Sequence, residues 1–175
     1  LITAGPTREP IDPVRFITNH STGKMGYSIA RIAMLRGADV TLVSGPVSLT
    51  PPMFCNTVNV SSAADMYEAV MKYAPDSDII IKSAAVADYR PVNVAAEKIK
   101  KSDSDTDNSI ALERTTDILA TLGRNKKPGQ LLCGFSMETE NMLENSRKKL
   151  IKKNADIIAA NSLRQEGAGF GTDTN

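Results

Sequence analysis

The feature that most constrains the fold is a long connection between the first expected strand and the first expected helix. It contains the segments TAGPTREP at residues 3–10 and NHSTGKMG at residues 19–26, and it is about twenty residues long. Connections between a strand and a helix usually have about 2–6 residues. A connection of this length, with both small and cationic residues, favours a role in binding a ligand.

The end of this connection predicts an anion site. Ser21, Thr22 and Gly23 offer hydroxyls and backbone N–H groups, and Gly23 and Gly26 let a ligand approach the main chain. The helix expected to begin near Lys24 adds the positive end of its dipole. We therefore expect Ser21, Thr22 and Gly23 to bind a phosphate. The alternative, in which the two glycines only let helix and strand pack closely, stays open.

Length and composition predict a single domain. The 175 residues can bury a sizeable core, and the net charge of +1 gives no general field that attracts nucleic acid or an anionic membrane. Cys55 and Cys133 are far apart in the sequence, and two reduced thiols suit a cytoplasmic protein. No apolar stretch approaches the roughly 20 residues that cross a bilayer. We expect one domain over 1–175 that is incomplete at both ends, because it begins inside a strand and stops in a glycine-rich tail.

Hydrophobic spacing predicts alternating strands and helices. After the opening strand, helices are expected at 25–37, 62–73, 117–122 (ended by Gly123) and 139–154, and strands at 40–43, 79–81, 110–112, 131–135 and 156–160. Ser62 and Asp65 have the spacing of a capping box. This alternation is typical of a Rossmann-like α/β fold, a mostly parallel twisted sheet with helices on both faces, whose ligands bind beyond the carboxyl ends of the strands.

One segment is too polar to pack. Three lysines, Lys98, Lys100 and Lys101, lead into a run of serine, aspartate, threonine and asparagine that ends at Asn108. Such a composition predicts a flexible flap at about 98–109.

Two familiar nucleotide patterns do not describe the first loop. A Walker A loop needs a glycine where Thr18 stands and a serine or threonine where Met25 stands. A dinucleotide fingerprint needs three spaced glycines and an acid at the end of the second strand, but this strand ends in Ser44, Gly45 and Pro46. A nicotinamide-dependent reductase is therefore disfavoured and remains an alternative.

The segment KSAAVADYRP at 82–91 leaves the third strand at its carboxyl end. Its small residues leave room for a flat base against Ala84 and Ala85, and Asp88 could accept a hydrogen bond from an exocyclic amine or a ribose. The alternative is that residues 84–87 pack under a helix and Asp88 starts a turn.

Lysines supply the remaining chemical signal. Lys149 and Lys153 are one helical turn apart, so they share a face of the last long helix. Together with the lysines of the flap they could hold a polyanion from several sides. His20 is the one histidine in the sequence, and no spacing of histidine and cysteine suggests a structural metal.

Taken together, these segments resemble the phosphopantothenoylcysteine synthetase domain of bacterial coenzyme A biosynthesis. The resemblance rests on residues 3–10, 19–26, 84–91 and 97–101, and it continues through Gly134 and Phe135 to residues 153–156 and 160–161. The resemblance spans nearly the whole chain. Its three long motifs, which are 3–10 together with 19–26, then 84–91, and then 97–101, are specific.

The resemblance implies a ligase that joins 4'-phosphopantothenate to L-cysteine. It implies CTP as the nucleotide, an acyl-cytidylate intermediate, release of CMP and pyrophosphate, a requirement for Mg²⁺, and a homodimer. It implies that Asn19 acts in the second half-reaction and that Lys98 and Lys101 act in the first. The CTP site would comprise Lys82, Ser83, Ala84, Asp88, Lys98, Thr116, Asp117, Ile118, Leu119, Phe135, Lys149 and Lys153, and the phosphate would meet Ser21, Thr22 and Gly23.

The chain departs from the family pattern at one point, where Thr115 and Thr116 stand in place of asparagine and proline. Bifunctional family members also carry a flavin-dependent decarboxylase domain ahead of this one. Two other functions remain open on the residues alone: an NADP-dependent reductase of the short-chain type, and a nucleotide-sensing module without catalysis.

Overall fold

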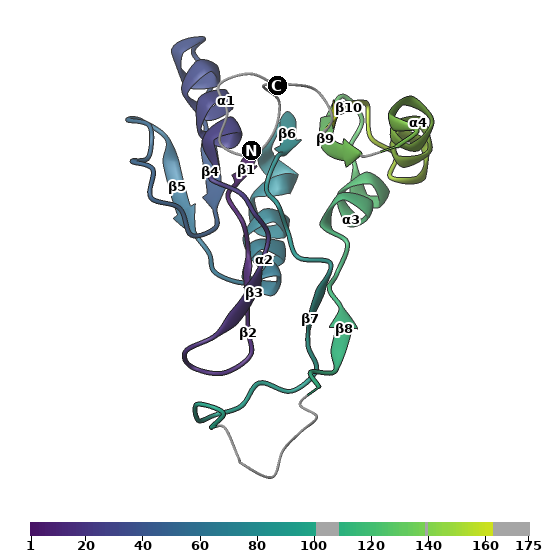
Figure 1. The fold of residues 1–175 in the computed structure, drawn as a ribbon. Helices are drawn as coiled ribbons and strands as arrows, with labels where there is room; N and C mark the ends of the chain where they lie inside the picture. The colour runs from purple at the N-terminus through teal and green to yellow at the C-terminus, as the bar shows by residue number, and fades with distance from the viewer. Residues whose placement is uncertain (101–108, 139, 163–175) are drawn as a thin grey trace.

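A parallel sheet forms the centre of the molecule. The computed structural model describes residues 1–100, 109–138 and 140–162. Within these residues the sheet has six strands in the order β10-β9-β6-β1-β4-β5, all parallel (Figure 1). They are β1 (Ile2–Ala4), β4 (Thr41–Ser44), β5 (Asn56–Asn59), β6 (Ile79–Lys82), β9 (Leu131–Glu138) and β10 (Ile157–Ser162). The expected parallel α/β sheet is confirmed.

Helices cover both faces of this sheet, as predicted. On one face, α1 (Lys24–Leu35) packs Tyr27 and Ala30 against a cluster that includes Ile2 and Leu42. On the other face, α2 (Ala63–Tyr73) and α3 (Ile118–Asn125) share a core with Ile80 and Leu132. A short 3-10 helix, η1 (Ala74–Asp76), follows α2, and α4 (Met142–Lys152) packs against β9 and β10.

The predicted capping box at the start of α2 is present. The Ser62 hydroxyl accepts a hydrogen bond from the Asp65 backbone N–H at 3.1 Å, and the Asp65 carboxylate accepts one from the Ser62 N–H at 2.8 Å. These reciprocal bonds satisfy two backbone donors that the first turn of a helix leaves without partners.

The long first connection contains a hairpin that the sequence did not predict. Strands β2 (Arg8–Pro10) and β3 (Phe16–Thr18) pair antiparallel. The Asp12 carboxylate fixes their turn by accepting hydrogen bonds from the backbone N–H groups of Val14 and Arg15, each at 2.8 Å, and by pairing with the Arg15 guanidinium. The hairpin hangs from the carboxyl edge of the main sheet (Figure 1).

A second hairpin lies beside the first, and it corrects the prediction of a strand at 110–112. Strand β8 occupies Leu112–Arg114 and pairs antiparallel with β7 (Tyr89–Pro91), so it is not part of the main sheet (Figure 1). Strand β8 begins two residues later than expected, because its position is set by the pairing of Glu113 with Arg90 and of Leu112 with Pro91.

Other elements also differ from the predictions, and strand β9 extends to Glu138, three residues beyond the expected end. Strand β5 was not expected, since its asparagines hide the apolar pattern. Helix α4 is shorter than the predicted 139–154. Gly123 lies inside α3, which continues to Asn125, so it does not end the helix. Residues 101–108 of the predicted flap lie outside the described residues. In the described part of the chain, no helix has the length and apolarity needed to span a membrane.

Candidate functional site

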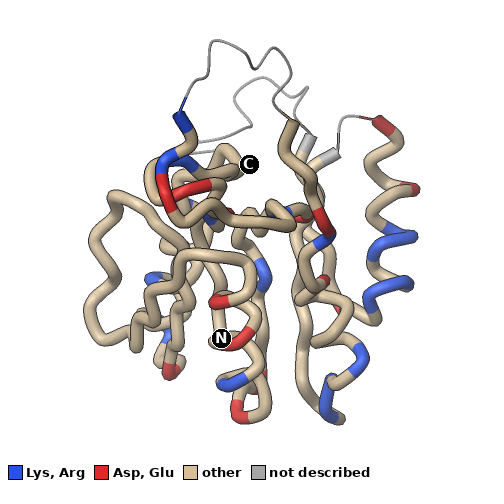
Figure 2. Tube along the Cα trace, turned by 90° about the horizontal axis from the view of Figure 1, so that it is seen from below, with Lys and Arg blue, Asp and Glu red and all other residues tan. Residues whose placement is uncertain are grey.

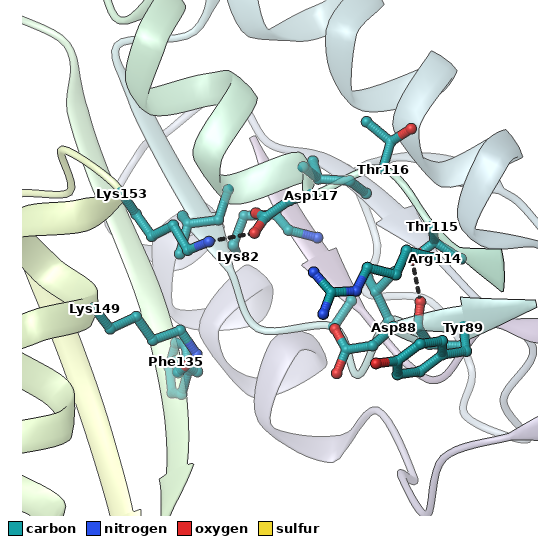
Figure 3. A pocket seen from close by; sticks show the side chains of 15 residues that line it. Lys82, Asp88, Tyr89, Arg114, Thr115, Thr116, Asp117, Phe135, Lys149 and Lys153 are labelled. Atoms are coloured by element: carbon teal, nitrogen blue, oxygen red, sulfur yellow. Dashed lines mark hydrogen bonds and ion pairs between the residues drawn. The ribbon is translucent and has the colours of Figure 1, made fainter.

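A cavity of about 410 Å³ opens beyond the carboxyl end of β6. Its walls come from the loop that follows β6, from β7 and β8, from the start of α3, and from β9 and α4 (Figure 3). The lining residues are Lys82, Ala84, Val86, Ala87, Asp88, Tyr89, Arg114, Thr115, Thr116, Asp117, Ile118, Leu119, Phe135, Lys149 and Lys153. The cavity therefore lies where a parallel α/β sheet normally binds its ligand.

The cavity brings together most of the residues expected to surround CTP. Those that line it are Lys82, Ala84, Asp88, Thr116, Asp117, Ile118, Leu119, Phe135, Lys149 and Lys153. Ser83 is not among them, because its hydroxyl donates a hydrogen bond to the Thr3 carbonyl at 2.5 Å and so supports the β1–β6 contact. Lys98 is also absent from the lining.

Asp117 and Lys153 form an ion pair at one wall (Figure 3). The Asp117 carboxylate also accepts a hydrogen bond from the Ala120 backbone N–H at 2.8 Å, which caps α3. Burial raises the pKa of Asp117, but the hydrogen bonds from Lys153 and Ala120 outweigh it, so the pKa lies below its usual value. The pair thus ties the end of α4 to the start of α3 in charged form.

Lys149 links α4 to strand β9. Its ammonium group donates a hydrogen bond to the Phe135 carbonyl at 2.7 Å. Lys149 of α4 and Lys153, which directly follows the helix, both line the cavity, in agreement with their predicted common face (Figure 3). Figure 2, seen from below, shows how lysine and arginine gather on this helix. The α4 wall therefore offers positive charge to a ligand.

Lys82 occupies the interior end of the cavity. The residue is only 8% exposed, and its ammonium nitrogen lies 3.8 Å from the Met66 sulfur of α2. Burial lowers the pKa of Lys82 to about 7, and the negative charge of Asp117 opposes that shift. This side chain changes its protonation near neutral pH.

The long first connection holds the loop that follows β6. The Asn19 side-chain nitrogen donates hydrogen bonds to the carbonyls of Ala85 at 3.2 Å and Val86 at 3.1 Å. The Thr7 hydroxyl accepts one from the Ala87 backbone N–H at 3.0 Å. Asn19 therefore lies directly behind the cavity wall, with its amide nitrogen bonded to the backbone.

Ser21, Thr22 and Gly23 form the turn that begins α1, and they do not line the cavity. The Ser21 hydroxyl accepts from the Gly23 N–H at 3.3 Å, and the Thr22 hydroxyl accepts from the Lys24 N–H at 3.4 Å. A methyl group at Gly23, whose φ is +78°, would lie 2.7 Å from a Val47 carbon.

Gly26 corrects one expectation about the first loop. A methyl group there would lie 2.5 Å from the Ala4 side chain and 2.8 Å from the Ser83 hydroxyl. The missing side chain at Gly26 thus lets α1 approach β1, and it does not open the main chain to a ligand. Gly23 likewise faces protein atoms of Val47 and Gly5. Both glycines therefore have the surroundings expected if they only let helix and strand pack closely.

Lys98 is exposed and lies near the first hairpin. Ile99, which follows Lys98, is bonded to this hairpin. Its carbonyl accepts a hydrogen bond from the Arg15 guanidinium at 2.8 Å, and its N–H donates to the Asp12 carboxylate at 3.1 Å. Lys101 lies outside the described residues. Within one chain the cavity thus contains Asp88 but neither Gly23 nor Lys98.

Sequence reasoning missed five lining residues: Val86, Ala87, Tyr89, Arg114 and Thr115. The first three belong to the segment at 82–91 that was singled out, so they could have been included. Arg114 and Thr115 required the correct register of β8. The Thr115 hydroxyl donates to the Ala87 carbonyl at 2.6 Å and joins the second hairpin to the cavity wall.

No group of three or more histidine, cysteine or acidic side chains that could hold a metal occurs among the described residues. The cavity itself carries two carboxylates, Asp88 and Asp117. Magnesium in nucleotide sites is usually held by one or two carboxylates together with phosphate oxygens and water. The Asp117 carboxylate already pairs with Lys153 and caps α3, so Asp88 is the carboxylate available to Mg²⁺, and one carboxylate with phosphate oxygens and water fits Mg²⁺ bound with a nucleotide.

Comparison with known proteins agrees with this architecture. The chain is 54% identical to the coenzyme A biosynthesis bifunctional protein CoaBC of Bacillus subtilis and 51% identical to that of Vibrio vulnificus, and both matches cover 100% of the chain. It spans 43% and 44% of the length of these relatives.

Solved structures show the same fold. A crystal structure of the C-terminal domain of CoaBC is 55% identical, with a TM-score of 0.80 over 91% of this chain and 74% of that one. The DNA/pantothenate metabolism flavoprotein of Streptococcus pneumoniae is 29% identical, with a TM-score of 0.83 over 95% of this chain and 82% of that one. The family model of the DNA/pantothenate metabolism flavoprotein C-terminal domain matches residues 1–175, and the chain belongs to that family.

Proposed function

We propose that this chain ligates 4'-phosphopantothenate to L-cysteine at the expense of CTP, in coenzyme A biosynthesis. The observation that carries the proposal is the cavity at the sheet edge, which contains ten of the twelve residues expected around CTP. The 55% identity to the C-terminal domain of CoaBC supports the assignment, because that protein is named for coenzyme A biosynthesis.

The charge of the cavity suits a triphosphate. Its lining has four cationic side chains, Lys82, Arg114, Lys149 and Lys153, and two anionic ones, Asp88 and Asp117. Such preorganised cations stabilise the charge that develops on phosphate oxygens during transfer. We propose that the lysines at the α4 wall hold the triphosphate and that Asp88 binds the nucleotide, either at the nucleoside or through Mg²⁺.

The first half-reaction joins the substrate carboxylate to the α-phosphate of CTP. A carboxyl group with a pKa near 4 is already ionised at neutral pH, so its attack requires no general base. The oxygen of the carboxylate forms the new P–O bond, and the bond to pyrophosphate breaks. The main barrier is the approach of two anions, which we propose Lys98 and Lys101 reduce by neutralising charge.

Bound Mg²⁺, which Asp88 would hold, would also neutralise charge on the triphosphate. In the part of the chain that is described, no ion pair occupies the Asp88 carboxylate. That carboxylate therefore lines the cavity outside any ion pair, and Arg114 lies near it in Figure 3.

In the second half-reaction the amine of cysteine attacks the acyl carbon, and CMP leaves. Negative charge gathers on the acyl oxygen, and we propose that Asn19 holds the acyl group in line, since both N–H groups of its amide already donate to backbone carbonyls. Because its amide nitrogen is bonded to the carbonyls of Ala85 and Val86, Asn19 also fixes the cavity wall against which the intermediate would lie.

The proposal extends to the assembly. We propose a homodimer, and a fusion or association with a flavin-dependent phosphopantothenoylcysteine decarboxylase domain. The relatives named bifunctional support the second point, since the chain spans 44% of the Vibrio vulnificus protein.

A pyrophosphate-release assay tests the central proposal. The protein is incubated with phosphopantothenate, cysteine and either CTP or ATP, and pyrophosphate and product are measured. We expect release with CTP that depends on phosphopantothenate. CTP binding without any pyrophosphate would instead indicate a sensing module, and binding of NADPH without CTP binding would indicate a reductase.

Two substitutions separate the half-reactions. We expect Lys98→Gln to prevent formation of the acyl-cytidylate, because a charge at the triphosphate is lost. We expect Asn19→Asp to leave formation of the intermediate measurable while amide formation falls sharply. Quenched reactions that resolve the intermediate from the product give both rates. Normal cytidylate accumulation in the Lys98 variant, or equal loss of both steps in the Asn19 variant, contradicts the assigned role.

A further inference from the structure

Lys82 differs from the other cationic side chains of the cavity in its burial. The residue is 8% exposed, and its ammonium nitrogen donates to the thioether sulfur of Met66 at 3.8 Å. A thioether is a weak hydrogen-bond acceptor. A lysine ammonium has three donors and is costly to bury without a partner. Within the described residues, no carboxylate or carbonyl accepts a hydrogen bond from it.

An apolar side chain at position 82 could pack in the same surroundings as the lysine. Met66, which contacts Lys82, belongs to an apolar cluster with Ile118 and Leu119, against which Ala84 packs, and these last three also line the cavity. A methionine or leucine at position 82 would avoid burying a charge. The ammonium group therefore has a use that appears only when a ligand is present, since a ligand can supply the acceptor that the protein does not.

The shape and charge at this place favour a nucleotide base over a phosphate. Aliphatic side chains beside Lys82 offer flat apolar surface, on which a heterocycle can lie. Asp117 is the charged group that acts on Lys82, and although its charge is paired with Lys153, its carboxylate can still accept a hydrogen bond from an exocyclic amine. Figure 3 shows Lys82 close to Asp117, away from the labelled Tyr89.

One acceptor distinguishes the two candidate nucleotides. Cytosine carries an amine, a ring nitrogen acceptor and a carbonyl oxygen, O2, along one edge. Adenine has an amine and a ring nitrogen in the same order, but it has a C–H group where cytosine has O2. A buried donor that meets O2 would therefore gain a hydrogen bond with cytosine that adenine cannot offer, and sites of this kind discriminate strongly.

We propose that Lys82 determines nucleotide choice by donating a hydrogen bond to the O2 carbonyl of a cytosine base. The inference rests on the proposed use of CTP and assigns the residue that selects it. Lys82 is a specificity residue in this scheme, and it takes no part in bond making.

The protonation of Lys82 makes the selection dependent on pH. The other charged side chains that line the cavity are Asp88, Arg114, Asp117, Lys149 and Lys153, and α2 presents the uncharged Met66. Because the pKa of Lys82 is lowered to about 7 by burial, its charged fraction falls as the pH rises above 7. The preference for CTP over ATP should fall over the same range, whereas the ionisation of the triphosphate is common to both nucleotides.

The test compares Lys82→Met with wild type, and it uses Lys72→Met on the exposed side of α2 as a matched control. Dissociation constants for CTP, ATP and CMP are measured by calorimetry at pH 6.5 and pH 8.5. We expect Lys82→Met to weaken CTP and CMP binding equally, by about tenfold or more, as for loss of a hydrogen bond from a charged donor. ATP affinity should stay within about twofold, and the pH dependence of the CTP preference should disappear.

Three outcomes overturn the inference. Equal losses for CTP and ATP place the contact on a shared part of the nucleotide. A loss for CTP that is absent for CMP places it on the β- or γ-phosphate. Unchanged CTP affinity removes Lys82 from recognition. The melting temperature of Lys82→Met verifies folding, and we expect it to be no lower than that of wild type. Failure of wild type to bind CTP at all contradicts the proposed function itself.

Discussion

Gly123 offers a direct test of how α3 and α4 meet at the cavity. It lies inside α3, where replacement of glycine by alanine usually stabilises a helix by about 1 kcal/mol. In this fold a methyl group at Gly123 would lie 1.8 Å from the carbonyl oxygen of Lys153 and 2.8 Å from its carbonyl carbon. We therefore expect Gly123→Ala to destabilise the protein, against the helix propensity.

The magnitude follows from the distance. A carbon and a carbonyl oxygen approach each other to about 3.3 Å, so the two backbones must separate by about 1.5 Å. Overpacking of a well-packed site costs about 1–3 kcal/mol, and the upper end applies because backbone atoms of two elements collide. After subtraction of the gain in helix propensity, we expect a net loss of about 2 kcal/mol. For a chain of this length that corresponds to a fall of about 4–8 °C in Tm.

The same displacement should reach the nucleotide site. It would move the end of α4, where Asn154 donates a hydrogen bond to the Gly123 carbonyl at 2.8 Å and where Lys153 pairs with Asp117. We expect Gly123→Ala to weaken CTP binding as well as to lower Tm. Calorimetric melting and CTP titration measure both effects, with Asn125→Ala at an exposed position of the same helix as control. A Tm equal to or above that of wild type would refute the close α3–α4 contact.

Two further predictions concern the core and the ion pair. Leu132 is 1% exposed, so we expect Leu132→Ala to lower the free energy of unfolding by about 2.7–5 kcal/mol, measured by urea denaturation at constant m-value. Because the folded pKa of Asp117 lies below its unfolded value, its contribution is present above about pH 4 and is lost as the pH falls through the folded pKa. The urea midpoints of wild type and Asp117→Asn should therefore differ at pH 7 and converge as the pH falls through the folded pKa of Asp117. A constant difference at all pH values would contradict the charged pair.

Local patterns in the sequence determined much of the fold. The alternating strands, the 3.6-residue periodicity of α1 and the capping box of Ser62 and Asp65 depend on residues within one or two turns of each other. The carboxyl end of β6 could be located from the segment at 82–91, and parallel sheets bind ligands at that edge. The CTP residues themselves came from the family resemblance, and ten of them lie in one cavity at this edge.

The roles of Gly26, Gly123 and Lys82 were decided by tertiary contacts. A local sequence pattern does not show such contacts, because the residues that touch are far apart along the chain. Gly26 looked available to a ligand, but it faces Ala4 across the α1–β1 contact. Gly123 looked like a helix end, but the carbonyl of Lys153, thirty residues later, explains the missing side chain. The same holds for Lys82, which the family resemblance placed in the CTP site but whose burial no sequence pattern indicated. Its burial against Met66 of α2, which gives this lysine its lowered pKa, arises only when the helix packs on the sheet.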